Sequence, residues 1–473
     1  YIDAQNYPSP AFDVASVAAN IVDASAGLSE YAIESYFARL SLAYKDRYVV
    51  NATIRTDGSS RFAPDCRWGW FPSVSVGWNV SNESFWNAEK TDLKIRASYG
   101  RTGNQDGISN YGWQALISGG VNYGGQSGIA ISSSGNDRLT WETADQYNAG
   151  FDLSFLGGKI NMIADVYLKN TNNLLYSKPV HATTGETSIL SNIGSMRNKG
   201  VEFTINTHLN LGKVLWSSSF NIARNVNKLT SLLEDDLLSI GANRALKLGR
   251  TVGSWYIFRT DGIYQYDGEV PQALYDKGVR AGDVKYWDRN GDGNITDDDR
   301  IVTGNPNPKF SGGWNNTFKY KGLELSLFFT YSYGNDVYAS WMIPGSKPGH
   351  TRSLLKAYAD NRWTGPGTSD KYPRAIYSYS GWNGKNSTMY LTDGSFIRLR
   401  SVTLGYTFPQ RLVSKIHLKG LRVYAQGDNV FLCSRYPGWD PETSVNLDPR
   451  FYGEDNDGVP QPRIFKLGVN ITF

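Results

Sequence analysis

The segment from Asp288 to Asp299 reads DRNGDGNITDDD and has the residue spacing of a calcium-binding loop. In such a loop, oxygen ligands stand at positions 1, 3, 5 and 12, a glycine at position 6 allows the sharp turn, and position 7 offers its carbonyl. Thr296 would supply one more oxygen ligand, either its own or that of a bound water. Asp299 replaces the usual glutamate at the twelfth position, so we expect weaker bidentate coordination there and a lower affinity for Ca²⁺. The predicted ligands are Asp288, Asn290, Asp292, Asn294 and Asp299.

Calcium loops of this kind usually lie between two helices, but the flanking residues here show no helical period. They read VKYW before the loop and RIVTGNPNP after it. The alternative is an Asn/Asp/Gly turn that holds no metal. A bound Ca²⁺ would be a structural cofactor, because no reactive partner lies nearby in the sequence.

Other residues with catalytic potential are scattered along the chain. The four histidines show no HExxH or comparable metal-ligand spacing; they are His181, His208, His350 and His417. The glycine-rich stretch 119–128 has neither GxGxxG nor a P-loop lysine. Carboxylates could pair as in a glycosidase, but a chain with 44 acidic residues offers many such pairs. The carboxylates considered are Glu142, Asp145, Asp440 and Glu442. We predict that the chain is not an enzyme.

Composition favours an all-β protein. The 473 residues include 30 Tyr, 14 Trp and 49 Gly but only 4 Met. The net charge of +4 is dispersed, so no nucleic-acid partner and no polybasic membrane patch are indicated. No run of 18 apolar residues occurs, which excludes a transmembrane helix. The first residues also lack the basic start and apolar core of a signal peptide.

Apolar and polar residues alternate with a period of two in many segments. In 323–333, Leu, Phe and Tyr at odd positions alternate with mostly polar residues, and 465–473 repeats the pattern and ends on Phe473. Such alternation predicts strands with one apolar and one polar face. We predict thirteen strands, at 34–44, 46–57, 69–80, 92–101, 142–156, 158–169, 198–209, 213–225, 309–320, 322–334, 391–407, 419–430 and 462–473.

The lengths of the connections distinguish a membrane barrel from a soluble sandwich. Every second connection is short, down to single residues at Lys45 and Gly157, whereas the others are mostly long, and the longest spans 226–308. This pattern is typical of a transmembrane antiparallel β-barrel with short periplasmic turns and long extracellular loops. Aromatic residues toward the strand ends fit the lipid headgroup region. They are Tyr44, Tyr48, Tyr99, Tyr167, Tyr320, Tyr331, Tyr333, Tyr406, Phe408 and Phe473.

Thirteen strands cannot close a single-chain bacterial barrel, because such barrels have an even number of strands and an open sheet edge cannot lie in lipid. We therefore expect at least one further strand before Tyr1. On this interpretation residues 1–473 are the C-terminal portion of a larger barrel.

Several segments resemble the barrel of the SusC/RagA-type TonB-dependent transporters of Bacteroidota. They follow that family's order from about residue 33 and include DRYVVNATIRTDGSSRFAPDCRWGWFPSVSVGWNVSNESFW, IGSMRNKGVEFTIN, FIRLRSVTLGYTFP and YPGWDPE. The resemblance implies a barrel of about 22 strands, of which this chain would hold the last thirteen or so. The family's plug domain, TonB box and signal peptide have no counterpart in this sequence.

The resemblance also implies a function, which is energised uptake of oligosaccharides or peptides across the bacterial outer membrane. A SusD-like surface lipoprotein would cap the extracellular mouth, and TonB would act from the periplasm through the plug region. Outer-membrane lipid would surround the barrel. The alternative is a soluble or surface-anchored all-β module, stabilised by calcium, that binds carbohydrate or serves as an adhesin.

Aromatic residues in the predicted extracellular connections could stack on sugars, pack against a lipoprotein, or pack the loops against one another. They are Trp113, Trp255, Tyr256, Tyr264, Trp341, Trp382, Tyr436 and Trp439. The sequence assigns none of them to substrate. Cys66 and Cys433 set no disulfide framework, and we expect both to be free thiols because they lie in loops far apart around the barrel wall.

Overall fold

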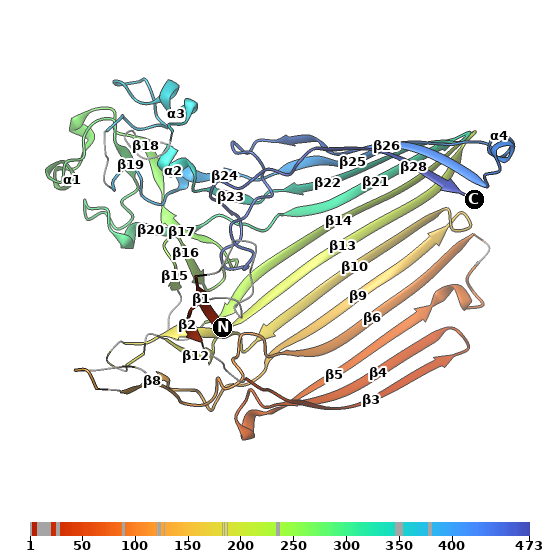
Figure 1. Cartoon of the computed structure of the whole chain (residues 1–473), viewed down its shortest axis with the longest axis horizontal. Helices are drawn as coiled ribbons and strands as arrows, with labels where there is room; N and C mark the ends of the chain where they lie inside the picture. The colour runs from red at the N-terminus through yellow and green to blue at the C-terminus, as the bar shows by residue number, and fades with distance from the viewer. Residues whose placement is uncertain are drawn as a thin grey trace.

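The computed structural model describes residues 2–6, 20–24, 29–87, 90–119, 121, 124–126, 128–181, 183, 185–186, 188–232, 237–345, 353–376 and 381–473. One 13-stranded antiparallel sheet dominates them and curves into a trough (Figure 1). Strands that are consecutive along the chain within this sheet are also neighbours in it. The predicted strand number and antiparallel topology are therefore confirmed.

The strands of this sheet, called the barrel sheet below, are β3 (Ile33–Tyr44), β4 (Tyr48–Ser59), β5 (Trp68–Asn79), β6 (Thr91–Asn104), β9 (Glu142–Phe155), β10 (Ile160–Asn172), β13 (Ser195–Leu211), β14 (Val214–Ser231), β21 (Phe310–Tyr320), β22 (Leu323–Tyr333), β25 (Phe396–Thr407), β26 (Gly420–Ser434) and β28 (Ile464–Thr472). The two edge strands are β3 and β28.

Short connections gather at one end of the barrel sheet and long ones at the other (Figure 1). Between β3 and β4 the chain reverses over residues 45–47, with φ of 53° at Lys45 and 51° at Asp46. Lys321 and Gly322 make a similar turn with φ of 47° and 89°. Positive φ at both central residues matches the right-handed twist of the flanking strands. The connection predicted from the sequence, a single residue at Lys45, was too short, because a hairpin turn needs two central residues.

Several strand boundaries differ from the sequence-based prediction by two to four residues, and two differ by more. β14 continues to Ser231 instead of ending at 225, because its main chain stays paired with β13 beyond the point where the apolar alternation fades. The predicted strand 391–407 is broken at Gly394. The residues before the break form β24 (Leu391–Asp393), which pairs with β23 (Asp336–Ala339) outside the barrel sheet.

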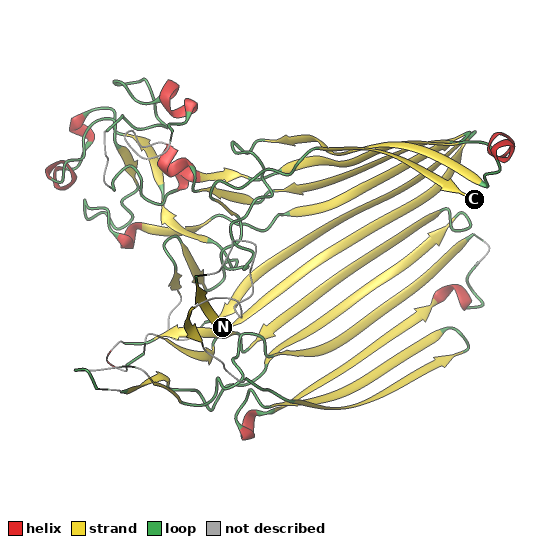
Figure 2. Cartoon of the chain, in the orientation of Figure 1, coloured by secondary structure: helices red, strands yellow, loops and turns green. Residues whose placement is uncertain are grey.

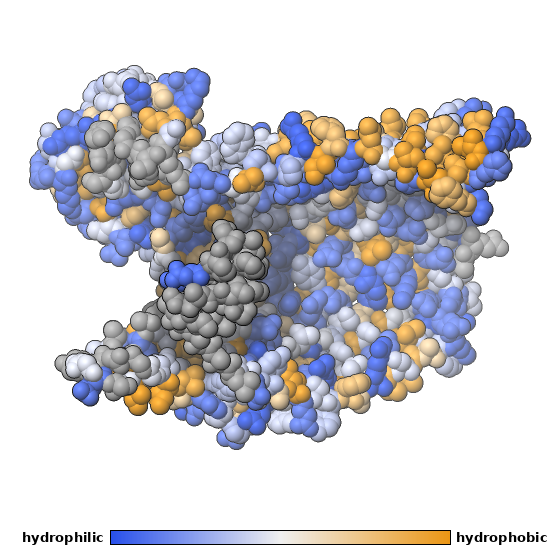
Figure 3. Space-filling model, in the orientation of Figure 1, coloured by the Kyte–Doolittle hydropathy of each residue, from blue (hydrophilic) through white to orange (hydrophobic). Residues whose placement is uncertain are grey.

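The register of the barrel sheet gives one face an apolar surface from edge to edge. Directly opposite residues project to the same face of an antiparallel pair. Leu327 stands opposite Val402, and Val469 stands opposite Val423. On the edge strand β28 this face is open, with Leu467 89% exposed. Figure 3 shows the corresponding hydrophobic band along β25, β26 and β28.

The opposite face lines the hollow of the trough and is polar (Figure 3). Arg96 lies 3.3 Å from Asp152 and 2.7 Å from Asp165, so three neighbouring strands are joined by ion pairs. Arg422 and Glu324 are joined similarly at 2.9 Å. A sheet with one apolar convex face and one polar concave face is suited to a wall between lipid and a water-filled lumen.

Aromatic rings flank the apolar face near the strand ends. At the end with short turns, Tyr48 stacks on Trp78 with ring centroids 6.5 Å apart, and Tyr44 stands opposite Tyr48. Tyr167 does not belong to this group. It lies in the middle of β10 on the polar face, where its ring covers Gly200. A Cβ added to Gly200 would lie 2.5 Å from this ring.

The described residues of the long connections 232–309, 334–395 and 435–463 form what we call the loop layer, at one end of the trough (Figure 2). Its helices are α1 (Gln272–Asp276), α2 (Met342–Gly345) and α3 (Lys356–Asn361), while α4 (Gln410–Val413) lies at the other end. Its 3-10 turns are η5 (Asp267–Glu269), η6 (Asp297–Asp299) and η7 (Thr388–Tyr390). In the part of the chain described, no helix has the length and apolar character needed to cross a bilayer.

Short strands organise the long connections. In the loop layer these are β15 (Leu237–Ile240), β16 (Arg244–Lys247), β17 (Trp255–Phe258), β18 (Thr260–Ile263), β19 (Val284–Tyr286), β20 (Arg300–Thr303), β23, β24 and β27 (Glu454–Asp455). The other short strands are β1 (Ile2–Gln5), β2 (Asn20–Ala24), β7 (Leu116–Gly119), β8 (Ile129–Ser133), β11 (Leu175–Pro179) and β12 (Ser188–Asn192).

Candidate functional site

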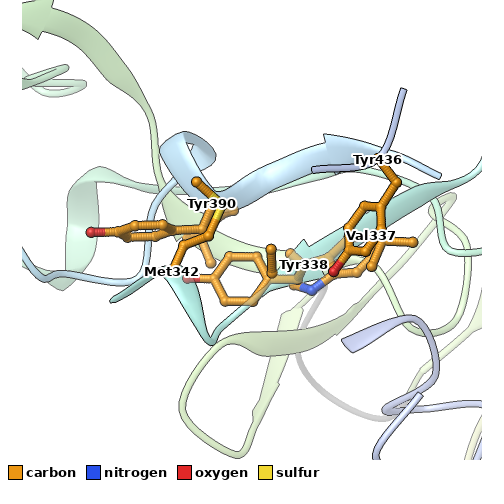
Figure 4. Close-up of a cluster of buried hydrophobic side chains, with 8 residues drawn as sticks. Val337, Tyr338, Met342, Tyr390 and Tyr436 are labelled. Atoms are coloured by element: carbon orange, nitrogen blue, oxygen red, sulfur yellow. The ribbon is translucent and has the colours of Figure 1, made fainter. Parts of the chain in front are cut away.

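The loop layer encloses a core of its own, drawn in Figure 4. Trp255 and Tyr338 are fully buried, with ring centroids 6.3 Å apart. Tyr390 and Tyr436 join them from the connections 334–395 and 435–463. Because one apolar cluster draws on all three connections, burying it holds the loop layer in a defined shape.

Seven of the eight loop aromatics considered from the sequence pack within the protein. They are buried or half-buried: Trp113, Trp255, Tyr256, Tyr264, Trp341, Trp382 and Tyr436. The Trp382 indole, for example, donates to the carbonyl of Val284 at 2.9 Å. Trp439 is different, because its side chain is 80% exposed. Of the eight, it alone offers most of its ring to a ligand or partner.

Arg244 is a buried cation within the loop layer that the sequence analysis did not single out. Its guanidinium lies 4.1 Å from the centroid of the Trp255 ring and 3.9 Å from Glu454. Burial lowers its pKa to about 10, so it keeps its charge at neutral pH. The charge is stabilised by the ring and by main-chain carbonyls. The carbonyls that accept its hydrogen bonds are those of Gly253, Phe451 and Tyr452.

A pocket of about 650 Å³ opens beside Trp439. Its volume lies in the range of sites that take small ligands. Asp455 and Asp457 are among the residues that line it. The apolar part of the wall consists of Trp341, Leu355, Pro437, Trp439, Val459 and Pro460.

Asp455 is buried in this pocket wall and held in place by two donors. The Tyr436 hydroxyl donates to its Oδ2 at 2.5 Å, and the Gly458 N–H donates to its Oδ1 at 2.9 Å. Burial, with the hydrogen bond to Asp455 next in importance, raises the pKa of Tyr436. Tyr436 therefore stays a neutral donor to Asp455.

The carboxylates considered as a catalytic pair hold arginines instead. Asp440 accepts a hydrogen bond from Arg398 at 2.5 Å, and both side chains are almost fully buried. Glu442 contacts Arg398 at 2.8 Å and also pairs with Arg400. These contacts anchor the connection 435–463 to β25, which is a structural role.

The remaining residues with catalytic potential do not come together in one site. Asp145 is held by Arg101 at 2.8 Å, and Glu142 accepts a hydrogen bond from the main-chain N–H of Leu175 at 3.3 Å. His350 lies outside the described residues. Among the residues that the structure describes, no three His, Cys, Asp or Glu side chains gather as a metal site.

The predicted calcium loop is a compact turn stabilised by its own acidic side chains. Asp288 accepts hydrogen bonds from the N–H groups of Gly291 and Gly293, at 2.7 and 2.8 Å. The buried Asp299 likewise accepts from two main-chain N–H groups of the loop, at 2.9 and 2.7 Å. Both carboxylates therefore point toward the inside of the turn.

The middle ligands of the predicted site are engaged with protein donors. Asp292 accepts from the Asn290 amide at 3.0 Å and from the Asn294 N–H at 2.7 Å. The side-chain oxygen of Asn294 accepts from Lys277 at 2.7 Å. The donor set is one of hard oxygens, which suits Ca²⁺, and each oxygen has a second lone pair. Lys277 does not occupy the main-chain carbonyl of Asn294, which is the predicted ligand at position 7, but coordination by Asp292 would require the Asn290 amide to move away.

A second exposed surface lies on the hairpin of β7 and β8. Ile117 stands opposite Ile131, and Ile129 lies two residues before Ile131 on the same face of the hairpin. The exposed fraction is 68% for Ile117, 62% for Ile131 and 72% for Ile129. An isolated two-stranded hairpin with an open apolar face is marginally stable in water, so this face is suited to contact with another surface.

Comparisons with known proteins agree on one architecture. Residues 1–430 match the family model described as TonB dependent receptor-like, beta-barrel. The chain is 35% identical to TonB-dependent receptor P26 of Formosa agariphila over 467 residues, which is 94% of this chain and 46% of that protein. It is 31% identical to TonB-dependent receptor SusC of Bacteroides thetaiotaomicron over 464 residues, which is 93% of this chain and 43% of that protein.

Solved structures share the fold. The RagAB peptide importer in its 'closed-closed' state superposes with a TM-score of 0.82 at 24% identity, covering 98% of this chain and 50% of that chain. A second structure, of the RagAB peptide transporter, gives a TM-score of 0.83 at 23% identity, covering 99% of this chain and 50% of that one. The chain thus spans about half the length of the proteins it matches.

Proposed function

The chain belongs to the TonB-dependent receptor-like β-barrel family, and we propose that it forms the C-terminal part of an outer-membrane nutrient importer of the SusC/RagA type. Its place is the bacterial outer membrane, and its role is transport rather than catalysis. The observation that carries this proposal is the barrel sheet itself. One face is apolar from edge to edge, the other is polar and concave, and the long connections all lie at one end.

Strands from outside this sequence complete the barrel. The edges of the barrel sheet, β3 and β28, leave hydrogen-bonding groups that lipid cannot satisfy. The matched relatives are about twice as long as this chain, which leaves room for further strands and a plug. TonB acts on that plug from the periplasm to energise import.

The cargo is an oligosaccharide or a peptide that passes along the polar face. This face carries amide, hydroxyl and paired charged groups, which bind water and polar solutes without selecting one small ion. Similarity to SusC and to a structure named as a peptide importer supports this class of cargo.

A SusD-like surface lipoprotein docks over the loop layer and its surroundings. The exposed isoleucine face of the β7–β8 hairpin and the exposed ring of Trp439 supply apolar contact area at the loop end. Aromatic and aliphatic anchors of this kind dominate the energy of protein interfaces.

A calcium ion bound by the loop 288–299 orders the connection 232–309. The supporting observations are the ligand spacing and the inward carboxylates of Asp288 and Asp299. The ion has a structural role, since the loop contains no group that would react with cargo.

The second candidate function is a calcium-stabilised surface module that binds carbohydrate or acts as an adhesin. The exposed apolar face of the barrel sheet argues against it, because a soluble module would bury that face. The two functions differ in solubility. An adhesin module would remain folded in water without detergent, whereas the barrel needs detergent and migrates differently on a gel before and after heating.

Uptake tests the proposal directly. Wild-type cells, cells lacking the gene, and cells lacking TonB are grown on a mixture of peptides and oligosaccharides, and the medium is followed by mass spectrometry. We expect at least one class of these solutes to disappear only with wild-type cells. Identical depletion by all three strains would contradict an import function.

A further inference from the structure

We propose that four cations on the outward, apolar face of β13 and β14 bind the phosphate groups of a lipid headgroup in the outer leaflet of the membrane. The cations are Arg197, Lys199, Arg224 and Lys228. The inference rests on the proposed function in one respect, which is that the barrel sheet spans the outer membrane. It adds a binding site and a ligand chemistry, and it depends on no particular cargo.

The register of the neighbouring strands β13 and β14 brings the four cations together (Figure 1). Arg197 stands directly opposite Lys228, and Arg224 stands opposite Val201. Lys199 lies between Arg197 and Val201 on the same side of β13, because every second residue of a strand faces one side. No run of basic residues marks this cluster in the sequence, which is why the sequence analysis indicated no polybasic membrane patch.

The cations lie where the apolar band of β13 ends. On the same face of this strand, apolar residues predominate from Val201 to Leu211, a stretch that advances by ten residues. It spans roughly 33 Å along the strand, which at a tilt of about 40° is about 25 Å across the membrane. That is the height of the apolar band of an outer-membrane barrel. Arg197 and Lys199 therefore lie at the level of the lipid headgroups, at the end that carries the long connections.

The positive charges of the cluster are not balanced within the described part of the protein. All four residues are exposed, and none of them forms an ion pair with a described residue. The guanidinium of Arg197 donates to the neutral amide oxygen of Asn170 at 2.8 Å, and that of Arg224 lies 5.5 Å from the centroid of the Phe310 ring. Like charges directly opposite each other, as at Arg197 and Lys228, destabilise a strand pair, so a bound anion would relieve their repulsion.

The acidic residue in the same cross-strand row is already engaged. In that row Asp145 stands opposite Asn170, which stands opposite Arg197. The Asp145 carboxylate pairs with Arg101 at 2.8 Å and accepts a hydrogen bond from the Tyr99 hydroxyl, also at 2.8 Å. Its charge therefore does not balance the cluster.

A phosphorylated lipid matches this surface better than a dissolved anion does. Its acyl chains lie against the apolar band, while its phosphate reaches the cations just above that band. Arginine binds phosphate with two parallel hydrogen bonds, and each lysine or arginine near a membrane surface strengthens the binding of anionic lipid. A dissolved phosphate would gain the charged contact alone.

Binding is tested on the full-length transporter in a nonionic detergent, with lipid A and with the same lipid after removal of its phosphate groups. Bound lipid is counted by native mass spectrometry during a titration at low salt. We expect phosphorylated lipid A to bind at least about tenfold more tightly than the dephosphorylated lipid. Equal binding of the two lipids would overturn the proposal, because apolar contact alone would then explain it.

The site is located with matched double variants. Arg197→Gln with Lys228→Gln removes two outward cations and should weaken binding of lipid A roughly thirtyfold. Lys94→Gln with Lys169→Gln removes two cations from the polar face of the barrel sheet and should leave binding unchanged. Wild-type binding by the Arg197→Gln/Lys228→Gln variant would show that the phosphate does not occupy this site.

A charge-conserving variant separates loss of charge from loss of structure. Arg197→Lys with Lys228→Arg keeps both cations and should retain tight binding of lipid A. The glutamine variant should fold at least as well as wild type, because it removes a repulsion between opposite residues. Heat-modifiable mobility on a gel checks that each variant is folded. An equal loss of binding in the charge-conserving variant would contradict a role of charge.

Two further outcomes would assign the cluster to another ligand and overturn the proposal. One is displacement of lipid A by inorganic phosphate, which would identify a site for a dissolved anion. The other is loss of the co-purifying lipoprotein from the glutamine variant with unchanged binding of lipid A, which would place an acidic protein surface on these cations. The assay needs neither cargo nor TonB, so absence of lipid binding would leave the import function standing, and absence of uptake with intact lipid binding would contradict import alone.

Discussion

The guanidinium of Arg374 forms two parallel hydrogen bonds with the carboxylate of Asp283, at 2.9 Å from Nε to Oδ1 and at 3.1 Å from Nη2 to Oδ2. The Asp283 side chain is only 3% exposed, and it also accepts from the Asn383 amide at 3.0 Å. This pair joins the connection 232–309 to the connection 334–395. Two segments far apart in sequence thereby become one structural unit.

Replacing Asp283 with Asn should open this part of the loop layer without unfolding the barrel sheet. The substitution leaves Arg374 facing a neutral group and removes one acceptor oxygen, which costs roughly 2–3 kcal/mol locally. Hydrogen exchange should show faster exchange near Asp283 and Arg374 and unchanged protection in the barrel strands. Asp360→Asn is the control, because its pair with Lys356 is exposed and contributes less than about 1 kcal/mol. Equal loss of protection in both variants would contradict this role for Asp283.

The two faces of the barrel sheet should tolerate charge differently. Val469→Arg and Leu327→Arg each place a cation on the apolar face and should cost roughly 2–4 kcal/mol near the membrane midplane. Asn470→Arg and Ser326→Arg place it on the polar face and should be tolerated. The fraction of folded barrel is measured from heat-modifiable mobility on a gel. Similar losses on both faces would show that the assignment of the faces is wrong.

The calcium proposal predicts a measurable metal content. Asp288→Ala with Asp292→Ala removes two ligands and should abolish bound calcium and reduce hydrogen-exchange protection in the connection 232–309. The control is Asp297→Ala with Asp298→Ala, which removes the same charge from outside the predicted ligand set. Elemental analysis of protein purified without chelator should detect calcium in wild type and in the control. Wild type without calcium would identify 288–299 as an ordinary polar turn.

The two cysteines are predicted to be free thiols. Neither is bridged in the structure; Cys66 is half-buried and Cys433 is exposed. Cys66 lies just before β5, and Cys433, expected in a loop, lies near the end of β26; β5 and β26 are nine positions apart in the barrel sheet. Mass spectrometry of unreduced protein should find each cysteine on a separate peptide and alkylated after unfolding. A linked peptide would mean that the connections approach each other across the trough.

The barrel sheet was largely predictable from the sequence because its determinants are local. Alternation of apolar and polar residues specifies a strand, and a two-residue turn such as Lys321–Gly322 specifies its antiparallel neighbour. Boundaries were less accurate where main-chain pairing outlasts the apolar pattern, as in β14, or where a glycine breaks it, as at Gly394.

The loop layer was not predictable because its contacts are long-range. Arg244 donates to the carbonyls of Phe451 and Tyr452, about two hundred residues away, and no period in the sequence relates them. Trp255 and Trp439 are both tryptophans in long connections, yet Trp255 is fully buried and Trp439 is exposed. Tertiary packing alone separates them, so sequence could name both as candidates but could not choose between them.

We propose that the concave polar face of the barrel sheet lines the path of import. Asn148 and Ala149 are neighbours in β9 that lie on opposite faces, Asn148 beside Ser98 on the polar face and Ala149 opposite Ala97 on the apolar face. Each is changed to Cys in a Cys66→Ser/Cys433→Ser background and labelled in cells with a polyethylene-glycol maleimide, with labelling verified by mass. Uptake of the solute that wild-type cells deplete is then measured. We expect label at Asn148→Cys to block uptake and label at Ala149→Cys to leave it unchanged. Unchanged uptake with fully labelled Asn148→Cys would show that cargo does not pass along the polar face.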